Sequence, residues 1–300
     1  MKLSVLIPIY NRSVYSLLNE LSFQSEQYGT SVEIICLDDG SDLYSAENKE
    51  TAERLQIPYH ISKNRGRAIS RNELVNLAEG EYLLFLDCDS GIVRTDFLSS
   101  YIELMIKQNS TVIYGGRIYP EKPDGKGFAL HWKYGKHIEA APLNKRLKNP
   151  HLTFMSNNFM VKKEIFQANP MDEALDKYGY EDLLWALELK KKNIPISHIN
   201  NPVLHEDLCS FDVFLSKSKQ ALANLAFLTT TKKLHHQSTP LLKTHKKLEL
   251  LKLLKLFRFF FRLSQPLLEF QLKSNYPLLV LFNIWKLGLY SKMKAQKNIN

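Results

Sequence analysis

The chain has 300 residues, of which 44% are hydrophobic and 24% charged, and its formal net charge is +9. This composition excludes a disordered or fibrous protein, and the length allows one large α/β domain or two small ones. No apolar run reaches the roughly 18 residues of a membrane-spanning helix, the N-terminus turns polar too soon for a signal peptide, and three cysteines without metal-site spacing favour reduced thiols in the cytoplasm.

Apolar runs and helical patterns alternate along the first 120 residues. Strands are expected where short apolar runs end in polar turns, at residues 3–9, 32–38, 57–62, 81–86 and 111–119. Helices are expected at residues 14–25, 44–55, 67–79 and 96–108. The alternation predicts an α/β fold with a Rossmann-like, mostly parallel central sheet flanked by helices.

The next part of the chain is less regular. Residues 120–150 are rich in Pro, Gly, Lys and aromatic residues and are expected to form an irregular loop. After this loop we expect a strand within 153–163, a helix at 183–192 and a strand at 194–199 that leads to His205.

The C-terminal segment, residues 232–300, differs in charge from the rest of the chain. It has 14 Lys or Arg residues but only two acidic ones, Glu249 and Glu269, so its net charge is +12 and that of residues 1–231 is −3. A basic segment suggests nucleic acid or an anionic membrane as partner. Its many Leu and Phe residues favour the membrane, because an arm that follows nucleic-acid phosphates would be more polar.

The same segment predicts a basic amphipathic helix. On a helical projection, four cations fall within a sector of roughly 80°, namely Lys247, Lys255, Arg258 and Arg262. Four apolar residues lie largely opposite, namely Leu253, Leu256, Phe260 and Leu263. Such a helix can lie in the interface of an anionic bilayer, and the alternative is that it covers the protein's own core with its cations solvated. We expect Pro266 and Pro277 to divide the segment.

Two acidic turns follow predicted strands, at the edge of a parallel sheet where ligands bind. Asp87 and Asp89 are two residues apart and can reach one divalent cation, Mn²⁺ or Mg²⁺, together with phosphate oxygens of a ligand. Asp39 follows another strand and can accept a hydrogen bond from a base or a ribose hydroxyl. Asp, Gly and Ser also form ordinary solvated turns, so each cluster has a structural alternative.

Arginines surround the start of the helix predicted at 67–79. The run NRGR at residues 64–67 and the pair RN at 71–72 suit phosphate binding, since guanidinium groups and a helix N-terminus both attract anions. The alternative is an ordinary junction of loop and helix with surface arginines.

Taken together, these motifs resemble the inverting family 2 glycosyltransferases of GT-A fold. The residues that carry the resemblance are Pro8-Ile9-Tyr10-Asn11, Asp38-Asp39-Gly40-Ser41, Asn64-Arg65-Gly66-Arg67-Ala68 with Arg71-Asn72, and Asp87-Cys88-Asp89. Downstream, a second set is similar to the acceptor half of galactosyltransferase-like and chondroitin-polymerase-like domains, namely Asn157-Asn158-Phe159, Met171-Asp172-Glu173 and Tyr178-Gly179-Tyr180-Glu181-Asp182. The resemblance covers about residues 1–210 and leaves out the C-terminal segment.

The resemblance implies a donor site. Pro8 and Tyr10 would border the nucleotide base, and Asp39 would hydrogen-bond to it. Arg71 would lie near the pyrophosphate, and Asp87 would contact the ribose or the metal.

It also implies a metal site for Mn²⁺ or Mg²⁺. Asp89 would ligate the metal directly, with Asp87 beside it. His205, in the run VLHED, resembles the family's late metal-ligating histidine, although a lone histidine there is more simply a loop residue.

The acceptor half implies the base. Asp182 matches the catalytic base, with Glu181, Tyr180, Trp185 and Asn158 on the acceptor side. The structural alternative is that the two acids serve only to stabilise the first turn of a helix. Trp185 follows Asp182 by three residues, so it can instead point into the core. A Tyr-Gly-Tyr run replaces the small residue or Trp-Gly-Gly run usual before these acids, which leaves the acceptor's identity open.

The expected function is metal-dependent, inverting transfer of a hexosyl or N-acetylhexosaminyl group from a nucleotide diphosphate sugar, UDP-sugar favoured, to a hydroxyl of a glycan or lipid-linked glycan. The alternative is a non-catalytic nucleotide-sugar-binding or scaffold subunit. A transferase domain is expected at 1–231, with a donor half at 1–118 and an acceptor half at 119–231. Residues 232–300 would bind the inner, cytoplasmic face of an anionic membrane, and no nucleic acid.

Overall fold

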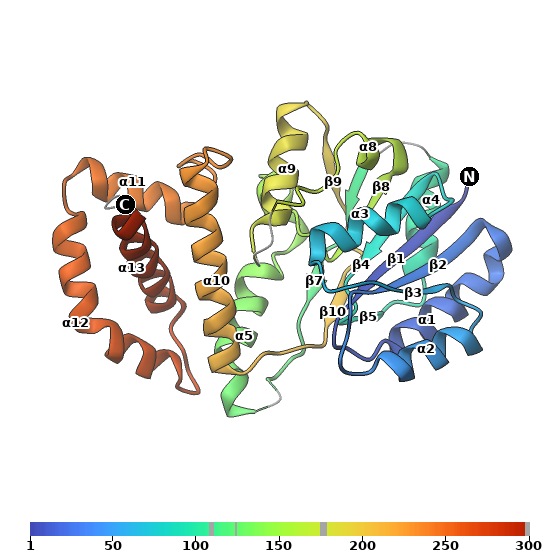
Figure 1. Ribbon diagram of the computed structural model, residues 1–300, viewed down its shortest axis with the longest axis horizontal. Helices are drawn as coiled ribbons and strands as arrows, with labels where there is room; N and C mark the ends of the chain where they lie inside the picture. The colour runs from blue at the N-terminus through green and yellow to red at the C-terminus, as the bar shows by residue number, and fades with distance from the viewer. Residues whose placement is uncertain (108–110, 124, 175–178, 298–300) are drawn as a thin grey trace. The chain divides into compact units, whose positions relative to one another are not determined.

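The computed structural model describes residues 1–107, 111–123, 125–174 and 179–297 (Figure 1). The chain forms two compact units. The first consists of Met1–Tyr119, Glu139–Asp176 and Glu181–Asp207, and the second of Pro120–Ile138, Lys177–Tyr180 and Leu208–Asn300. The domain boundary expected at residue 231 stays a prediction.

A seven-stranded sheet lies at the centre of the first unit, in the strand order β3-β2-β1-β4-β8-β6-β9. The strands are β1 (Leu3–Ile9), β2 (Val32–Asp38), β3 (Tyr59–Ile61), β4 (Tyr82–Leu86), β6 (Val112–Tyr114), β8 (Asn158–Lys162) and β9 (Ile196–His198). β8 is antiparallel to β4 and β6, while the other neighbours pair in parallel. This confirms the mostly parallel sheet, and it brings the carboxyl ends of β1, β2 and β4 to one edge.

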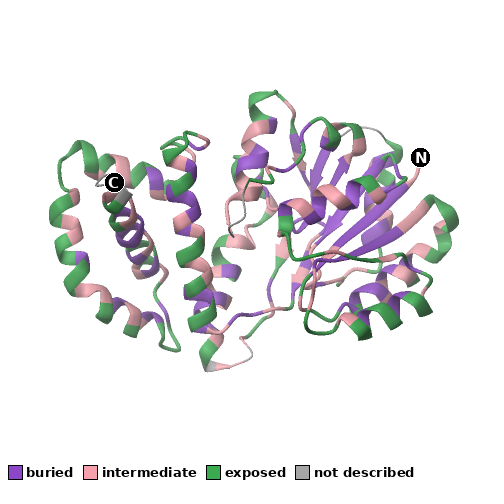
Figure 2. Ribbon diagram, viewed as in Figure 1, coloured by how far each residue is buried: buried purple, intermediate pink, exposed green. Residues whose placement is uncertain are grey.

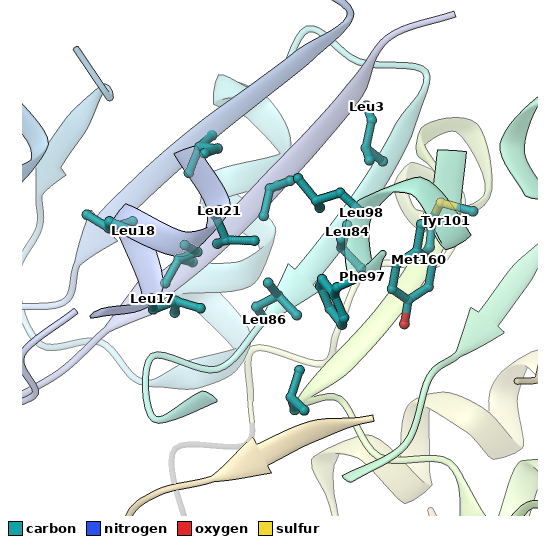
Figure 3. Close-up of a cluster of buried hydrophobic side chains, with 14 of the residues drawn as sticks. Leu3, Leu17, Leu18, Leu21, Leu84, Leu86, Phe97, Leu98, Tyr101 and Met160 are labelled. Atoms are coloured by element: carbon teal, nitrogen blue, oxygen red, sulfur yellow. The ribbon is translucent and has the colours of Figure 1, made fainter. Parts of the chain in front are cut away.

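Helices cover both faces of this sheet. They are α1 (Tyr15–Ser25), α2 (Ser45–Arg54), α3 (Arg67–Leu77), α4 (Phe97–Ile106), α6 (Leu143–Arg146), α7 (Pro150–Thr153), α8 (Lys163–Gln167) and α9 (Glu181–Lys191), with the 3₁₀ turn η1 (Glu26–Ser31). In β1, Leu3 and Val5 belong to a core shared with α1 and α4 (Figure 3). Leu6 belongs to a second core, shared with α3 and α9. The strand can serve two cores because its successive side chains point to opposite faces.

A small second sheet, in the order β5-β10-β7, lies beside the acidic turn. Its strands are β5 (Ser90–Gly91), β7 (Arg117–Ile118) and β10 (Val203–His205). The single strand expected at 111–119 is therefore two strands, β6 and β7. The break falls at Gly115 and Gly116, where a Cβ on Gly115 would lie 2.5 Å from Asn201 O and Gly116 has a φ of +104°.

Residues 120–150 are not the irregular loop expected from their composition. Outside residue 124, which is not described, they form η2 (Lys126–Phe128), α5 (Ala129–Tyr134), a π-helical turn η3 (Gly135–Glu139) and α6. The helix forms because Ala129, Leu130 and His131 are buried, a tertiary effect that overrides the local turn signals.

The second unit is helical. Besides α5 it contains α10 (Phe211–Thr230), α11 (Pro240–Leu250), α12 (Leu254–Leu272) and α13 (Leu279–Lys297). α13 packs against α10, α11 and α12. At the core of this unit the ring of Phe282 stacks on Trp285 and meets Phe214 at a tilt. This confirms a helical C-terminal extension. None of the helices in the described ranges is long and apolar enough to cross a membrane.

One of the two expected proline breaks is wrong. Pro277 does separate α12 from α13, but Pro266 lies inside α12. Proline removes one backbone hydrogen bond there, yet Phe261 and Leu268 are buried on either side of it in a helix that packs on α13. Packing on both sides of the proline holds the helix continuous.

Candidate active site

The site lies at the sheet edge where β1, β2 and β4 end. Tyr10 follows β1 and is 45% exposed, whereas Pro8 is half-buried within the strand. Asp39 follows β2, and Asp87 follows β4. The parallel register carries residues far apart in sequence to the same edge, as the sequence predicted.

The two acids after β2 both hold the backbone around them. Asp38 accepts hydrogen bonds from Ser41 N, Ser45 Oγ and Tyr59 Oη at 2.7–2.8 Å. Burial acts to raise the pKa of Asp38, but these hydrogen bonds outweigh burial and lower it. Asp39 accepts from the backbone N–H groups of Arg65 (2.9 Å) and Gly66 (2.8 Å). Asp39 thus anchors the loop of residues 64–66, which precedes α3, to the end of β2.

A buried arginine meets the acidic turn. Arg71, on α3, is 1% exposed and its Nη2 lies 2.5 Å from Asp87 Oδ1. Arg117, on β7, approaches the other oxygen of Asp87, with Nη2 to Oδ2 at 3.9 Å. Within the described residues, Nε and Nη1 of Arg71 and Nε of Arg117 are buried without a hydrogen-bond partner. Unpaired buried donors are costly, so this is a place where a ligand's oxygens would be stabilised.

Sequence reasoning missed Arg117 and Glu139. Arg117 Nη1 lies 2.9 Å from Glu139 Oε2, which also accepts a hydrogen bond from Tyr119 Oη. Burial acts to lower the pKa of Arg117, but Tyr119, Glu139 and the acids of the turn hold it well above its ordinary value. The Gly-Gly pair before Arg117 was the available signal, since it breaks the strand and redirects the chain. No sequence signal pointed to Glu139, because it lies within residues 120–150, which were expected to form a loop.

Asp89 and His205, the two residues that the resemblance assigned to a metal, lie side by side. β10 pairs with β5, so His205 is opposite Ser90, and its Nδ1 lies 3.4 Å from Asp89 Oδ2. Burial acts to raise the pKa of Asp89, but the neighbouring His205 outweighs burial and keeps that pKa well below its usual range. Asp89 Oδ1 is buried and has no hydrogen-bond partner among the described residues. The residues that the structure describes contain no group of three or more His, Cys, Asp or Glu that could hold a metal ion without other ligands.

Glu181 and Asp182 begin α9. Burial and the adjacent charge of Glu181 raise the pKa of Asp182 to about 7, while Arg71 acts to lower it. Glu181 Oε1 lies 4.0 Å from Arg67 Nη1, and its Oε2 is buried without a hydrogen-bond partner in the described part of the chain. Arg67 and Arg71 share α3, so this one helix reaches both the acid pair and the turn at Asp87.

Two residues expected on the acceptor side lie in the core instead. Trp185 is buried, its Nε1 donates to Asn169 O at 2.7 Å, and its ring packs against Phe154, Phe159 and Phe166. Asn158 is fully buried, and its Nδ2 donates to Gly116 O and Asn201 O while its Oδ1 accepts from Tyr101 Oη. Tyr180 falls in the second unit and has a φ of +71°. Tyr178 of the same motif lies outside the described residues.

Comparison with known sequences supports the motif argument. The chain matches the family described as Glycosyl transferase family 2 over residues 4–169. It is 26% identical over 230 residues to the uncharacterized glycosyltransferase YfnE of Bacillus subtilis, covering 61% of this chain and 58% of that protein. It is 31% identical over 128 residues to the poly(ribitol-phosphate) beta-glucosyltransferase of Bacillus spizizenii, covering 39% and 19%. The chain thus spans less than two thirds of the length of these relatives.

Solved structures share the fold. The mannosyltransferase of Pyrobaculum calidifontis, in complex with GDP-Man and Mn²⁺, has a TM-score of 0.58 at 11% identity and covers 99% of this chain and 87% of its own. The glucosyl-3-phosphoglycerate synthase of Mycobacterium tuberculosis, in complex with Mg²⁺ and UDP, has a TM-score of 0.52 at 14% identity and covers 76% and 78%. At these identities the likeness establishes the GT-A fold alone.

Proposed function

The chain belongs to glycosyl transferase family 2, and we therefore propose that it moves a sugar from a nucleotide diphosphate sugar to a hydroxyl of a glycan or lipid-linked glycan. A UDP-sugar is the favoured donor. The single observation that carries the proposal is the gathering at one sheet edge of the buried Arg71 and the largely buried Arg117, the Asp89–His205 pair and a carboxyl with a raised pKa. Each of these groups suits one chemical requirement of glycosyl transfer.

The arginines suit the leaving diphosphate. A nucleoside diphosphate gains negative charge as the sugar departs, and fixed cations stabilise that charge best where water is excluded. Arg71 and Arg117 are held by Asp87 and Glu139 but still present buried N–H groups without partners in the described chain. The loop that Asp39 anchors leads into α3, which carries Arg71, and would border the nucleotide.

The Asp89–His205 pair suits a divalent cation. Asp89 Oδ1 is a buried, unused acceptor, and a carboxylate with an imidazole is a ligand set compatible with Mn²⁺. Two protein ligands are enough where the donor's phosphate oxygens complete the shell. Asp87 is already engaged by Arg71 and Arg117, so we assign it to those arginines first. When bound, the cation neutralises charge on the diphosphate.

Asp182 suits the general base. An acceptor hydroxyl is a poor nucleophile until a positioned carboxylate takes its proton, and such a base works best with a pKa near the working pH. Asp182 meets this condition because burial and Glu181 raise its pKa to about 7. One base and a single displacement invert the anomeric centre.

The location proposed for the protein is cytoplasmic, at the inner face of an anionic membrane. The basic segment, residues 232–300, would bring the enzyme to a lipid-linked acceptor. Its helices are too short or too polar to span the bilayer in the described residues, so contact would be peripheral.

The test is a donor screen with purified protein, Mn²⁺ and a panel of nucleotide sugars, read out as released nucleoside diphosphate. We expect slow hydrolysis of one donor by the wild type, a loss of at least about 100-fold in Asp89→Ala, and a loss of about 100-fold or more in Asp182→Asn. Glu50→Gln, an exposed acid of α2, is the matched control and should keep full activity.

Other outcomes separate the alternatives. Metal-dependent donor binding that Asp182→Asn leaves unchanged, with no turnover in the presence of glycan or lipid-linked acceptors, would favour the non-catalytic subunit. Absence of both binding and turnover for every donor would refute the transferase proposal.

A further inference from the structure

Helix α12 carries an exposed apolar face. Six of its residues are between 54% and 78% exposed, namely Leu256, Phe259, Phe260, Leu263, Leu267 and Phe270. At 100° per residue they fall within a sector of about 100°. We call these six residues the apolar stripe. Single exposed apolar residues are ordinary on a protein surface, but a continuous row along about four turns marks an interaction site.

The stripe is not needed to hold α12 in its own unit. The other side of the helix, with Phe261, Leu268 and Leu272, is buried, and α12 packs there on α13. The Phe261 ring lies so close to Gly288 of α13 that a Cβ on Gly288 would clash with it. Trp285 Nε1 donates to Glu269 Oε1 at 2.9 Å across the same contact. The helix is therefore anchored on one side while the stripe is exposed on another, where Figure 2 shows long exposed stretches of α12.

Cations line one edge of the stripe. On the same projection, four of them lie in a sector of about 60° next to Phe259, namely Lys255, Arg258, Arg262 and Lys273. The one acid of α12, Glu269, accepts hydrogen bonds from Trp285 and Gln265. With a net charge of +12 over residues 232–300, this surface attracts anions.

The apolar stripe and the cations along its edge together fit one kind of partner. Pairing with a second copy would bury the stripe but bring two strongly basic segments together, at an electrostatic cost. Nucleic acid would pair with the cations but leave six large apolar side chains in water. An anionic bilayer accepts both at once, because lipid phosphates pair with Lys and Arg while the headgroup–acyl boundary receives Leu and Phe.

We infer that α12 lies flat in the interface of an anionic lipid bilayer, with the apolar stripe inserted below the phosphates and the basic edge among them. The inference deepens the membrane contact in the proposed function by assigning it to one face of one helix. It does not depend on catalysis, so its test can fail or succeed separately.

The test measures co-sedimentation of the full chain with vesicles of phosphatidylcholine alone or mixed equally with phosphatidylglycerol. We expect binding to the anionic vesicles, and a loss of at least about 10-fold in affinity for Leu263→Gln combined with Leu267→Gln. Both residues are exposed, so the fold should be unaffected. Phe23→Ser is the matched control, because Phe23 is 69% exposed on α1 and outside the stripe.

Two further measurements identify the geometry and the charge. Leu263→Trp should show blue-shifted emission, quenched by brominated acyl chains, on adding anionic vesicles. Lys255→Gln with Arg262→Gln should weaken binding about 10-fold and reduce its dependence on salt.

Several results would overturn the inference. These are full binding by the stripe variant, absence of binding to anionic vesicles, or a dimer of the wild type that the stripe variant converts to monomer. If donor turnover is intact in any of those cases, only the membrane face is refuted. Vesicle binding with neither binding nor turnover of any donor would refute the transferase proposal and leave the membrane face standing.

Discussion

Arg71 Nη2 lies 2.5 Å from Asp87 Oδ1, and the guanidinium in this ion pair is almost wholly buried. Arg71 comes from the first turns of α3 and Asp87 from the end of β4, 16 residues later. A buried cation without its anion is costly, because water no longer solvates it. The ion pair therefore holds α3 against the turn at Asp87 even without a bound ligand.

Asp87→Ala should accordingly destabilise the protein by about 2–3 kcal/mol, since it leaves Arg71 buried and Arg117 with one acid fewer. The measurement is the free energy of unfolding in urea. Asp96→Ala is the matched control, because Asp96 makes an equally short ion pair with Arg94 but is exposed, and it should change stability little. Equal effects of the two substitutions would contradict the role given to the buried pair.

Donor turnover should rise with pH through about 7 and then level off. Only the ionised form of Asp182 can take a proton, and burial with the charge of Glu181 raises its pKa to about 7. Glu181→Gln removes the like charge, so the rising limb should move to lower pH. The check is the pH profile of kcat/KM for both proteins, and a limb that stays in place would argue against the coupling of these two acids.

The same shift predicts a pH-dependent stability change for Asp182→Asn. The pKa of Asp182 is higher in the folded state than its ordinary 3.8, so the folded protein binds the extra proton between about pH 4 and 7. Ionised Asp182 thus destabilises the fold above pH 7, and the stability of Asp182→Asn relative to the wild type should rise as the pH increases from about 4 to 7. The gain should vanish below about pH 4. Thermal unfolding from pH 4 to 8 measures it without any substrate.

Mn²⁺ should strengthen binding of a nucleoside diphosphate in the wild type but not in Asp89→Ala. Asp89 Oδ1 is the buried acceptor that a cation would use, and His205 lies 3.4 Å from the other oxygen. Isothermal titration with UDP, with and without Mn²⁺, gives the ratio, and we expect at least about a 10-fold effect for a charge-neutralising ion. Glu206→Gln, an exposed neighbour of His205, should keep that effect. A Mn²⁺ effect of wild-type size in Asp89→Ala would locate the cation elsewhere.

Gly115→Ala should lower stability by about 2 kcal/mol or more. A Cβ at this position would lie 2.5 Å from Asn158 Nδ2 and from Asn201 O, so β6, β8 and the loop before β10 would have to separate. Gly127→Ala is the control, since a Cβ there meets no atom within 4 Å. Unfolding midpoints compare the two variants, and a stable Gly115→Ala would mean that the break between β6 and β7 is not sterically enforced.

Much of the site could be predicted because its signals are local. The acids after β2 and β4 sit at strand ends, and parallel strands place their carboxyl ends at one edge whatever the rest of the chain does. Arg71 was equally visible, since it lies in the second turn of a helix that follows a strand. The resemblance to a known family rested on these same residues, and the family match covers them.

Arg117, Glu139, Trp185 and Asn158 show where local signals end. Arg117 and Glu139 enter the site through a glycine break and a helical stretch whose composition looked like a loop. Trp185 lies nearly one helical turn from Asp182, a spacing that allows either the site or the core. Packing against three phenylalanines decided for the core.

By itself, the sequence determined the order of the main strands and helices over residues 1–107, the acidic turns at the strand ends and the basic character of residues 232–300. These follow from periods of 2 and 3.6 residues and from charge, which act over a few residues. Only the tertiary structure decided which side chains face one another and which face of α12 stays exposed. Such choices depend on contacts between residues far apart in the chain, as when α13 buries one side of α12 and leaves the apolar stripe in water.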